Sequence, residues 1–215
     1  MSGPAAIVGG TTDAGHPGVV AIVERRTLCT SAEQVRCSGT LIAPRVVLTA
    51  AHCLDGRNPD ELEVGFATDV QLAPRTIVAV QAAAIHPDYV ANQAVAGHDL
   101  ALLLLAAPAP SDVAPIALAA TTPATLLSGA DVTLVAFGAP ADHRDGGARL
   151  TAPATVATVT ATELTTDGGA IPCGADSGGA VVMPTADGER LVAVIKASGA
   201  GCVHPGLATM IVDEQ

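Results

Sequence analysis

Aromatic side chains are nearly absent from this chain, whose 215 residues include no tryptophan, one tyrosine and two phenylalanines. Its core must therefore consist of small aliphatic side chains, and apolar residues are 49% of the total, enough for a large buried core. Long apolar runs are also absent, since the longest covers only positions 100–107. That run is far shorter than the roughly 18 residues a membrane-spanning helix needs, so the sequence predicts no membrane span.

Basic residues are scarce, with ten Lys and Arg against 21 Asp and Glu and a net charge of −11. They are scattered, and only Arg25 and Arg26 are adjacent. A nucleic-acid-binding surface needs a clustered basic face, so we expect no nucleic-acid partner. We interpret the excess of acidic residues as a contribution to solubility.

The first six residues, Met-Ser-Gly-Pro-Ala-Ala, lack the charged and apolar regions of a secretory signal peptide. Either a signal peptide is not part of this chain, or the protein stays inside the cell. The five cysteines favour the first alternative, because disulfides persist in oxidising compartments. We therefore expect a secreted protein, extracellular or periplasmic.

No segment has a sustained helical period. Short β-rich stretches recur instead, separated by Gly, Pro and Asp, and they lie at 19–23, 39–42, 46–49, 76–80, 100–104, 132–137, 155–160, 180–183, 191–195 and 209–212. Many short strands with turn signals between them predict an all-β sandwich or barrels. Three prolines within 106–115 mark the best candidate for a linker between two halves.

Three short strings carry residues suited to hydrolysis: Thr-Ala-Ala-His-Cys at 49–53, His-Asp-Leu-Ala-Leu-Leu at 98–103 and Cys-Gly-Ala-Asp-Ser-Gly-Gly at 173–179. A serine hydroxyl becomes nucleophilic when an imidazole takes its proton and a carboxylate holds the other ring nitrogen. Taken alone, each string is more often structural: a packed His, a capping Asp, a Gly-rich turn. Together they predict a triad of His52, Asp99 and Ser177.

The strings and their order resemble the trypsin/chymotrypsin-like serine protease family. This resemblance covers about 7–212 and is dense at the motifs. It implies two antiparallel six-stranded Greek-key β-barrels with the active site in the cleft between them. We expect an N-terminal barrel at 7–105, a linker at 106–115 and a C-terminal barrel at 116–215.

The resemblance also implies that the N–H groups of Ala175 and Ser177 form the oxyanion hole. In the family a glycine occupies the position of Ala175. If that position needs a positive φ, a methyl group there introduces strain of about 1–3 kcal/mol. A flipped peptide would instead remove one donor, which is worth about 10²–10³ in rate.

Ile-Val-Gly-Gly at 7–10 resembles the family's mature N-terminus. There a freed ammonium group of Ile7 would enter a pocket and pair with Asp176, which orders the oxyanion loop. With Met1–Ala6 attached, this ammonium cannot form and the chain would be a zymogen. An ordinary strand start is the alternative reading.

By family position, Cys37 pairs with Cys53 and Cys173 with Cys202, which leaves Cys29 over. A zinc site near 52–53 is the competing interpretation. It lacks a second Cys/His pair at ligand spacing, so we expect no metal and no cofactor.

Family spacing places Ile171 at the base of the specificity pocket, where trypsin-like enzymes carry Asp. We therefore expect no cleavage after basic residues and a preference for apolar P1 side chains. Pro172 can reshape the base, while Gly199 and Gly206 match the pocket-wall glycines. The strand that would pair with substrate contains Ala197, Ser198 and Gly199, where Ala197 and Ser198 replace the family's serine and tryptophan.

These residues predict a serine endopeptidase that acts on proteins or peptides, with protein inhibitors as further partners. Two alternatives stay open. One is a protease-like binding protein impaired by Ala175, or inactive until Ile7 is freed. The other is an esterase that uses the same triad.

Overall fold

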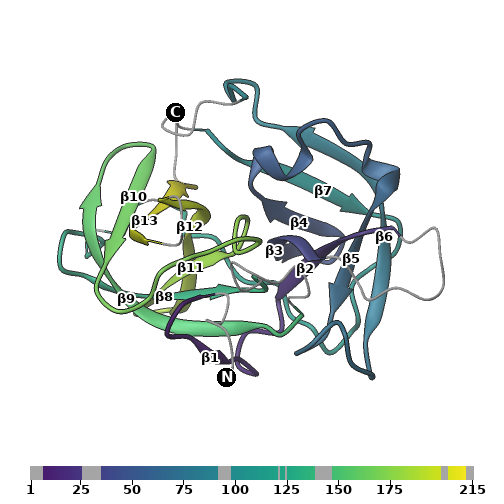
Figure 1. Ribbon diagram of the computed structural model, residues 1–215, viewed down its shortest axis with the longest axis horizontal. Coiled ribbons are helices and arrows are strands. Elements are labelled where there is room, and N and C mark those ends of the chain that lie inside the picture. The colour runs from purple at the N-terminus through teal and green to yellow at the C-terminus, as the bar shows by residue number, and fades with distance from the viewer. Residues whose placement is uncertain are drawn as a thin grey trace.

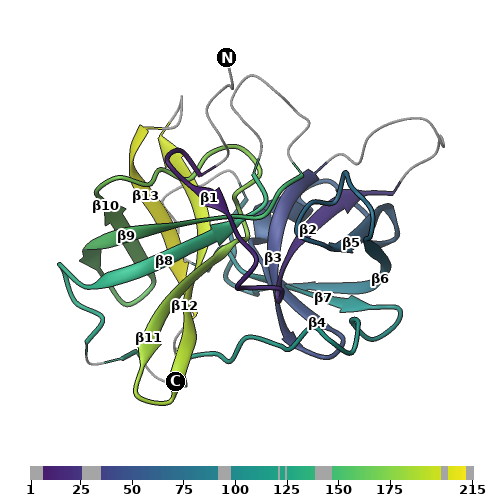
Figure 2. The ribbon, with the colours of Figure 1, turned by 90° about the horizontal axis from the view of Figure 1, so that it is seen from below.

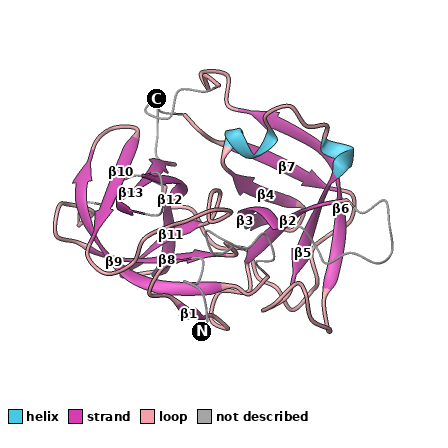
Figure 3. Cartoon of the chain, viewed as in Figure 1, coloured by secondary structure: helices cyan, strands magenta, loops and turns pink. Residues whose placement is uncertain are grey.

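A computed structural model describes residues 7–25, 35–91, 98–120, 122–123, 125–138, 147–199 and 203–211, with the backbone alone at 197–199 and 203–205. The structure is almost entirely β, and its two short 3-10 helices, η1 (Ala51–Leu54) and η2 (Pro59–Glu61), lie in the first half (Figure 3). No helix in these ranges is long and apolar enough to cross a membrane.

Two antiparallel barrels lie side by side (Figure 1). The first is closed in the order β2-β3-β4-β7-β6-β5. Its strands are β2 (Val19–Glu24), β3 (Val35–Ala43), β4 (Val46–Thr49), β5 (Leu62–Phe66), β6 (Thr76–Ile85) and β7 (Ala101–Leu105).

The second barrel has the order β9-β10-β13-β12-β11-β8 and is closed because β8 also pairs with β9. Its strands are β8 (Asp131–Ala136), β9 (Leu150–Val159), β10 (Glu163–Asp167), β11 (Ala180–Thr185), β12 (Gly188–Gly199) and β13 (Val203–Met210). Both barrels thus share one strand order, although the sequence has no visible repeat. The predicted fold is confirmed.

Small aliphatic side chains fill both barrels. In β7 the burial alternates, so Leu103 and Leu105 are fully buried while Leu102 and Leu104 face outward. In β2 the first five residues are all buried, because this strand packs against its own barrel and, through β8, against the other. The low aromatic content is compatible with a dense core of Val, Leu, Ile and Ala.

The N-terminal residues lie with the second barrel, as Figure 2 shows for β1 (Thr11–Thr12). β1 pairs with β9, and Ile7 is buried in the core of the second barrel. The expected N-terminal barrel at 7–105 included these residues, whereas the barrel's own strands begin at Val19. The linker and the boundaries at 105 and 116 stay predictions.

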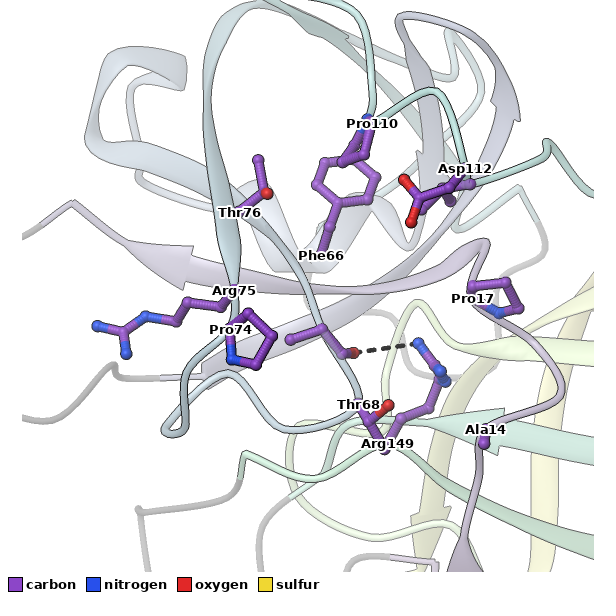
Figure 4. Close-up of a pocket in the computed structure, with 12 residues that line it drawn as sticks. Ala14, Pro17, Phe66, Thr68, Pro74, Arg75, Thr76, Pro110, Asp112 and Arg149 are labelled. Atoms are coloured by element: carbon purple, nitrogen blue, oxygen red, sulfur yellow. Dashed lines mark hydrogen bonds between the residues drawn. The ribbon is translucent and has the colours of Figure 1, made fainter.

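A buried arginine joins the two barrels. Arg149 donates from Nε to Asp13 at 2.8 Å and from one terminal nitrogen to the carbonyls of Val19 and Ala67. A cavity of about 360 Å³ beside it is lined from both barrels, and Figure 4 shows the bond from Arg149 that crosses between them. None of the predicted site residues lines this cavity.

Candidate active site

His52 and Asp99 meet because their strands are neighbours. β4 ends three residues before His52, β7 starts two residues after Asp99, and Thr49 at the end of β4 pairs with Ala101. His52 Nδ1 lies 2.7 Å from one oxygen of Asp99, and the His52 backbone N–H donates to the other at 2.9 Å. The carboxylate therefore holds the ring at Nδ1 and the backbone of the same residue at its N–H, and Nε2 takes no part in this pair.

The Asp99 carboxylate is 2% exposed. Burial on its own raises the pKa of this group, but the hydrogen bonds and charge of His52 outweigh burial and hold the pKa below its usual value. The charge of Lys196 acts in the same direction. Asp99 thus stays ionised and can stabilise a protonated imidazole.

Residues 173–179, here called the serine loop, lie against the first barrel. The carbonyl of Ser177 accepts the backbone N–H of Ser38 at 2.7 Å. A Cβ atom at Gly178 would lie 2.1 Å from the Ser38 carbonyl oxygen, and φ is +85° there. Only glycine allows this approach, so the residue after the serine is fixed by packing.

The Ser177 hydroxyl is hydrogen-bonded to a backbone carbonyl of β12. Ser177 Oγ donates to the carbonyl of Lys196 at 2.9 Å. Cys53 Sγ lies 3.8 Å from the Ser177 carbonyl oxygen and 4.0 Å from His52 Nε2, so serine and imidazole flank the same sulfur. Catalytic hydrogen bonds in unliganded enzymes are often loose, and a rotation about the serine Cα–Cβ bond redirects this hydroxyl.

Ala175 adopts the left-handed conformation, with φ of +64°. The strain expected from a side chain at a glycine position is therefore present, at about 1–3 kcal/mol. The Ala175 carbonyl accepts a hydrogen bond from Ser38 Oγ at 3.1 Å. Its peptide is thus anchored to the first barrel.

Asp176 is completely buried, and its carboxylate accepts the N–H groups of Gly138 at 2.9 Å and Cys173 at 2.6 Å. Burial raises its pKa to about 7, because these two donors offset only part of the desolvation. Ile7 is also fully buried, and Val8 pairs with Ile171, two residues before Cys173. In the described part of the chain, no bond between Ile7 and Asp176 is recorded.

The disulfide between Cys37 and Cys53 is present, with an S–S distance of 1.99 Å. It ties β3 to the residue that follows His52. Cys173 is also disulfide-bonded, and its partner lies outside the described ranges, as do Cys29 and Cys202.

The residues assigned to the specificity pocket are partly described. Ile171 is half-buried and Pro172 buried. A Cβ atom at Gly206 would lie 2.9 Å from Pro172 Cδ, so the two residues are in close contact. Ala197, Ser198 and Gly199 lie in β12 opposite Leu207, Gly206 and Val203, and their side chains fall outside the described part.

Sequence reasoning missed two residues beside Ser177. Ser38 contacts the serine loop through both its backbone and its side chain. Lys196 is 4% exposed, occupies a bulge of β12 and pairs with Glu163 at 3.1 Å. The adjacency of Ser38 to the predicted disulfide could have indicated the first, whereas nothing in the sequence marks Lys196.

Among the described residues, two groups of side chains have spacings that could suit a metal ion. One contains His52 with Cys37 and Cys53, whose sulfurs are joined to each other. The other contains His86, Asp88 and His98, and its two rings are stacked 4.8 Å apart. The expectation of no metal stays a prediction.

Comparison with known proteins agrees with this geometry. The family model described as Trypsin matches residues 7–213. A protein named trypsin from Saccharopolyspora erythraea is 31% identical over 210 residues, which cover 89% of this chain and 85% of that protein. Chymotrypsin-like elastase family member 1 of Macaca fascicularis is 36% identical over 47% of this chain and 38% of its own length. Brachyurin of Leptuca pugilator is 32% identical over 51% of this chain and 48% of its own length.

Proposed function

The chain belongs to the trypsin family of serine proteases, and from that premise we propose that it is a serine endopeptidase acting through an acyl-enzyme. Ser177 attacks the scissile carbonyl, and its proton passes to Nε2 of His52, which then protonates the leaving amine. Asp99 holds the ring and balances the imidazolium charge. The observation that carries this proposal is the 2.7 Å contact of Asp99 with Nδ1, which leaves Nε2 for the serine.

The N–H groups of Ala175 and Ser177 receive the negative charge that develops on the substrate oxygen. Such donors stabilise the transition state because they are fixed before the reaction begins. The anchoring of the Ala175 and Ser177 carbonyls to Ser38 supports this assignment, since it restrains the Ala175–Asp176 and Ser177–Gly178 peptides, which directly follow the two residues that donate.

Activation depends on the release of Ile7. Removal of Met1–Ala6 creates an ammonium group that pairs with Asp176, and the uncleaved chain is the zymogen. The raised pKa of Asp176, about 7, supports this role, because a buried carboxylate without a cation is costly to ionise.

The substrate is a protein or peptide with an apolar P1 side chain, since Ile171 and Pro172 supply no carboxylate for a basic one. By family position, Gly206 and Gly199 form the wall of the pocket for that side chain. The disulfide beside His52 supports secretion into an oxidising compartment, where protein inhibitors are further partners.

A non-catalytic binding protein is the second candidate, favoured by the bond from Ser177 Oγ to Lys196 and by the strained Ala175. A fluorophosphonate separates the two. We expect stoichiometric labelling of Ser177 in the chain that begins at Ile7, none in Ser177→Ala and full labelling in Ser128→Ala, which alters an exposed serine. A wild-type chain that stays unlabelled contradicts the peptidase, and turnover of esters without amides indicates an esterase. Cleavage of a peptide library tests the P1 preference.

A further inference from the structure

A fully buried serine of the first barrel holds the serine loop at two points. The backbone N–H of Ser38 donates to the Ser177 carbonyl at 2.7 Å, and its hydroxyl donates to the Ala175 carbonyl at 3.1 Å. These two bonds lie on either side of Asp176. We propose that Ser38 is a positioning residue that keeps the oxyanion hole formed despite the alanine at 175; this inference rests on the proposed peptidase function.

The direction of the hydrogen bonds around Ser38 is fixed. The N–H of Phe137, just after β8, donates to Ser38 Oγ at 2.7 Å. A backbone amide can only donate, so the hydroxyl proton is left for the Ala175 carbonyl. The two hydrogen bonds therefore run in series, from the Phe137 N–H to Ser38 Oγ and from Ser38 Oγ to the Ala175 carbonyl.

The conformation at Ala175 explains why such an anchor matters. A residue with a Cβ atom at φ of +64° is strained, and a change to negative φ would relieve that strain. Such a change would turn the Gly174–Ala175 peptide, whose N–H is assigned to the oxyanion. A buried hydrogen bond contributes free energy of the same order as this strain. Ser38 holds the Ala175 carbonyl, which lies in the Ala175–Asp176 peptide on the other side of the Ala175 Cα, and so opposes a change in φ that moves this carbonyl.

Ser38 is also held from the base side of the site. Thr49 Oγ1 donates to the Ser38 carbonyl at 2.8 Å, and Thr49 lies three residues before His52. The neighbouring Cys37 is bonded to Cys53. Ser38 therefore fixes the position of the serine loop relative to the imidazole. It also fixes the orientation of the Ala175–Asp176 peptide.

The test is a cycle of Ser38→Ala and Ala175→Gly in the chain that begins at Ile7, with Thr40→Val as control. Thr40 is equally buried in β3, and its hydroxyl has no recorded partner. We expect Ser38→Ala to lower kcat about tenfold at unchanged KM. In the Ala175→Gly background the loss should shrink to about twofold, because glycine removes the strain. Thr40→Val should leave kcat unchanged.

Hydrogen exchange of the Phe137 amide supplies a readout that needs no activity. Ser38→Ala should speed this exchange at least about tenfold, since the amide loses its acceptor. If the wild type and Ala175→Gly both lack turnover while exchange is accelerated, the peptidase proposal fails and the anchor stands. An unchanged exchange rate overturns the positioning role. Where the wild type turns over, an unchanged kcat in Ser38→Ala or equal losses in both backgrounds overturns it as well.

Discussion

The two halves of the site are held in different ways. His52 and Asp99, the base half, come from neighbouring strands of one barrel and contact each other directly. The serine loop, the nucleophile half, depends on distant groups: Ser38 from the other barrel, and the N–H of Gly138 on Asp176. Sheet register therefore sets the base half, whereas the nucleophile half needs long-range contacts and is the half that the proposed release of Ile7 would control.

The largest expected effect comes from breaking the base half. Asp99→Asn keeps the size of the side chain but removes the charge that fixes the His52 tautomer. We expect kcat to fall about 10⁴-fold while the thermal unfolding temperature changes little. Steady-state kinetics beside Asp131→Asn, which alters an exposed aspartate, measures this. A loss below tenfold would mean that Asp99 does not orient the imidazole.

The second effect concerns the contact between the two barrels that Arg149 makes. Arg149→Met removes a cation that is 3% exposed and leaves Asp13 buried with His16 and the backbone N–H of Gly15. Loss of one partner of a buried pair costs about 3 kcal/mol in the free energy of unfolding. Denaturant titration should show this loss, and Asp13→Asn with Arg149→Met should recover part of it. Additive losses would mean that the pair is not coupled.

The sequence predicts features set by local patterns and misses features set by long-range contacts, as in the two halves of the site. The alternation in β7 and the three motif strings are local patterns, and they indicated the strand, the fold and the triad. β5 and β10 were missed because they carry Glu, Gly, Thr and Asp in place of an apolar run. The side-chain contacts of Ser38 join residues 99 and 137 positions apart, so no local pattern encodes them. The direction of the Ser177 hydroxyl depends on Lys196, 19 positions away at a bulge of β12.

The third prediction uses pH to compare the chain with Met1–Ala6 attached and the chain that begins at Ile7. The pKa of Asp176 is about 7 in the folded state and near 3.8 unfolded. Between these values the folded chain binds more protons, so this group makes stability fall as pH rises, by up to about 1.4 kcal/mol per pH unit. The slope of unfolding free energy from pH 4 to 7 should be weaker in Asp176→Asn.

The same difference in slope should be smaller in the chain that begins at Ile7, because its ammonium group stabilises the ionised carboxylate. An equal difference in both forms of the chain would contradict the pairing of Ile7 with Asp176.

The smallest effect comes from relaxing the nucleophile half. Ala175→Gly removes left-handed strain of about 1–3 kcal/mol, but glycine also gains entropy in the unfolded chain, which costs about 0.4–1 kcal/mol. Strain is the larger quantity, so the free energy of unfolding should rise by about 1 kcal/mol. In Ala82→Gly, at an exposed position of β6, only the entropy acts and stability should fall. If both variants lose stability equally, Ala175 is not strained, and the contrast between the two halves of the site would no longer include backbone conformation.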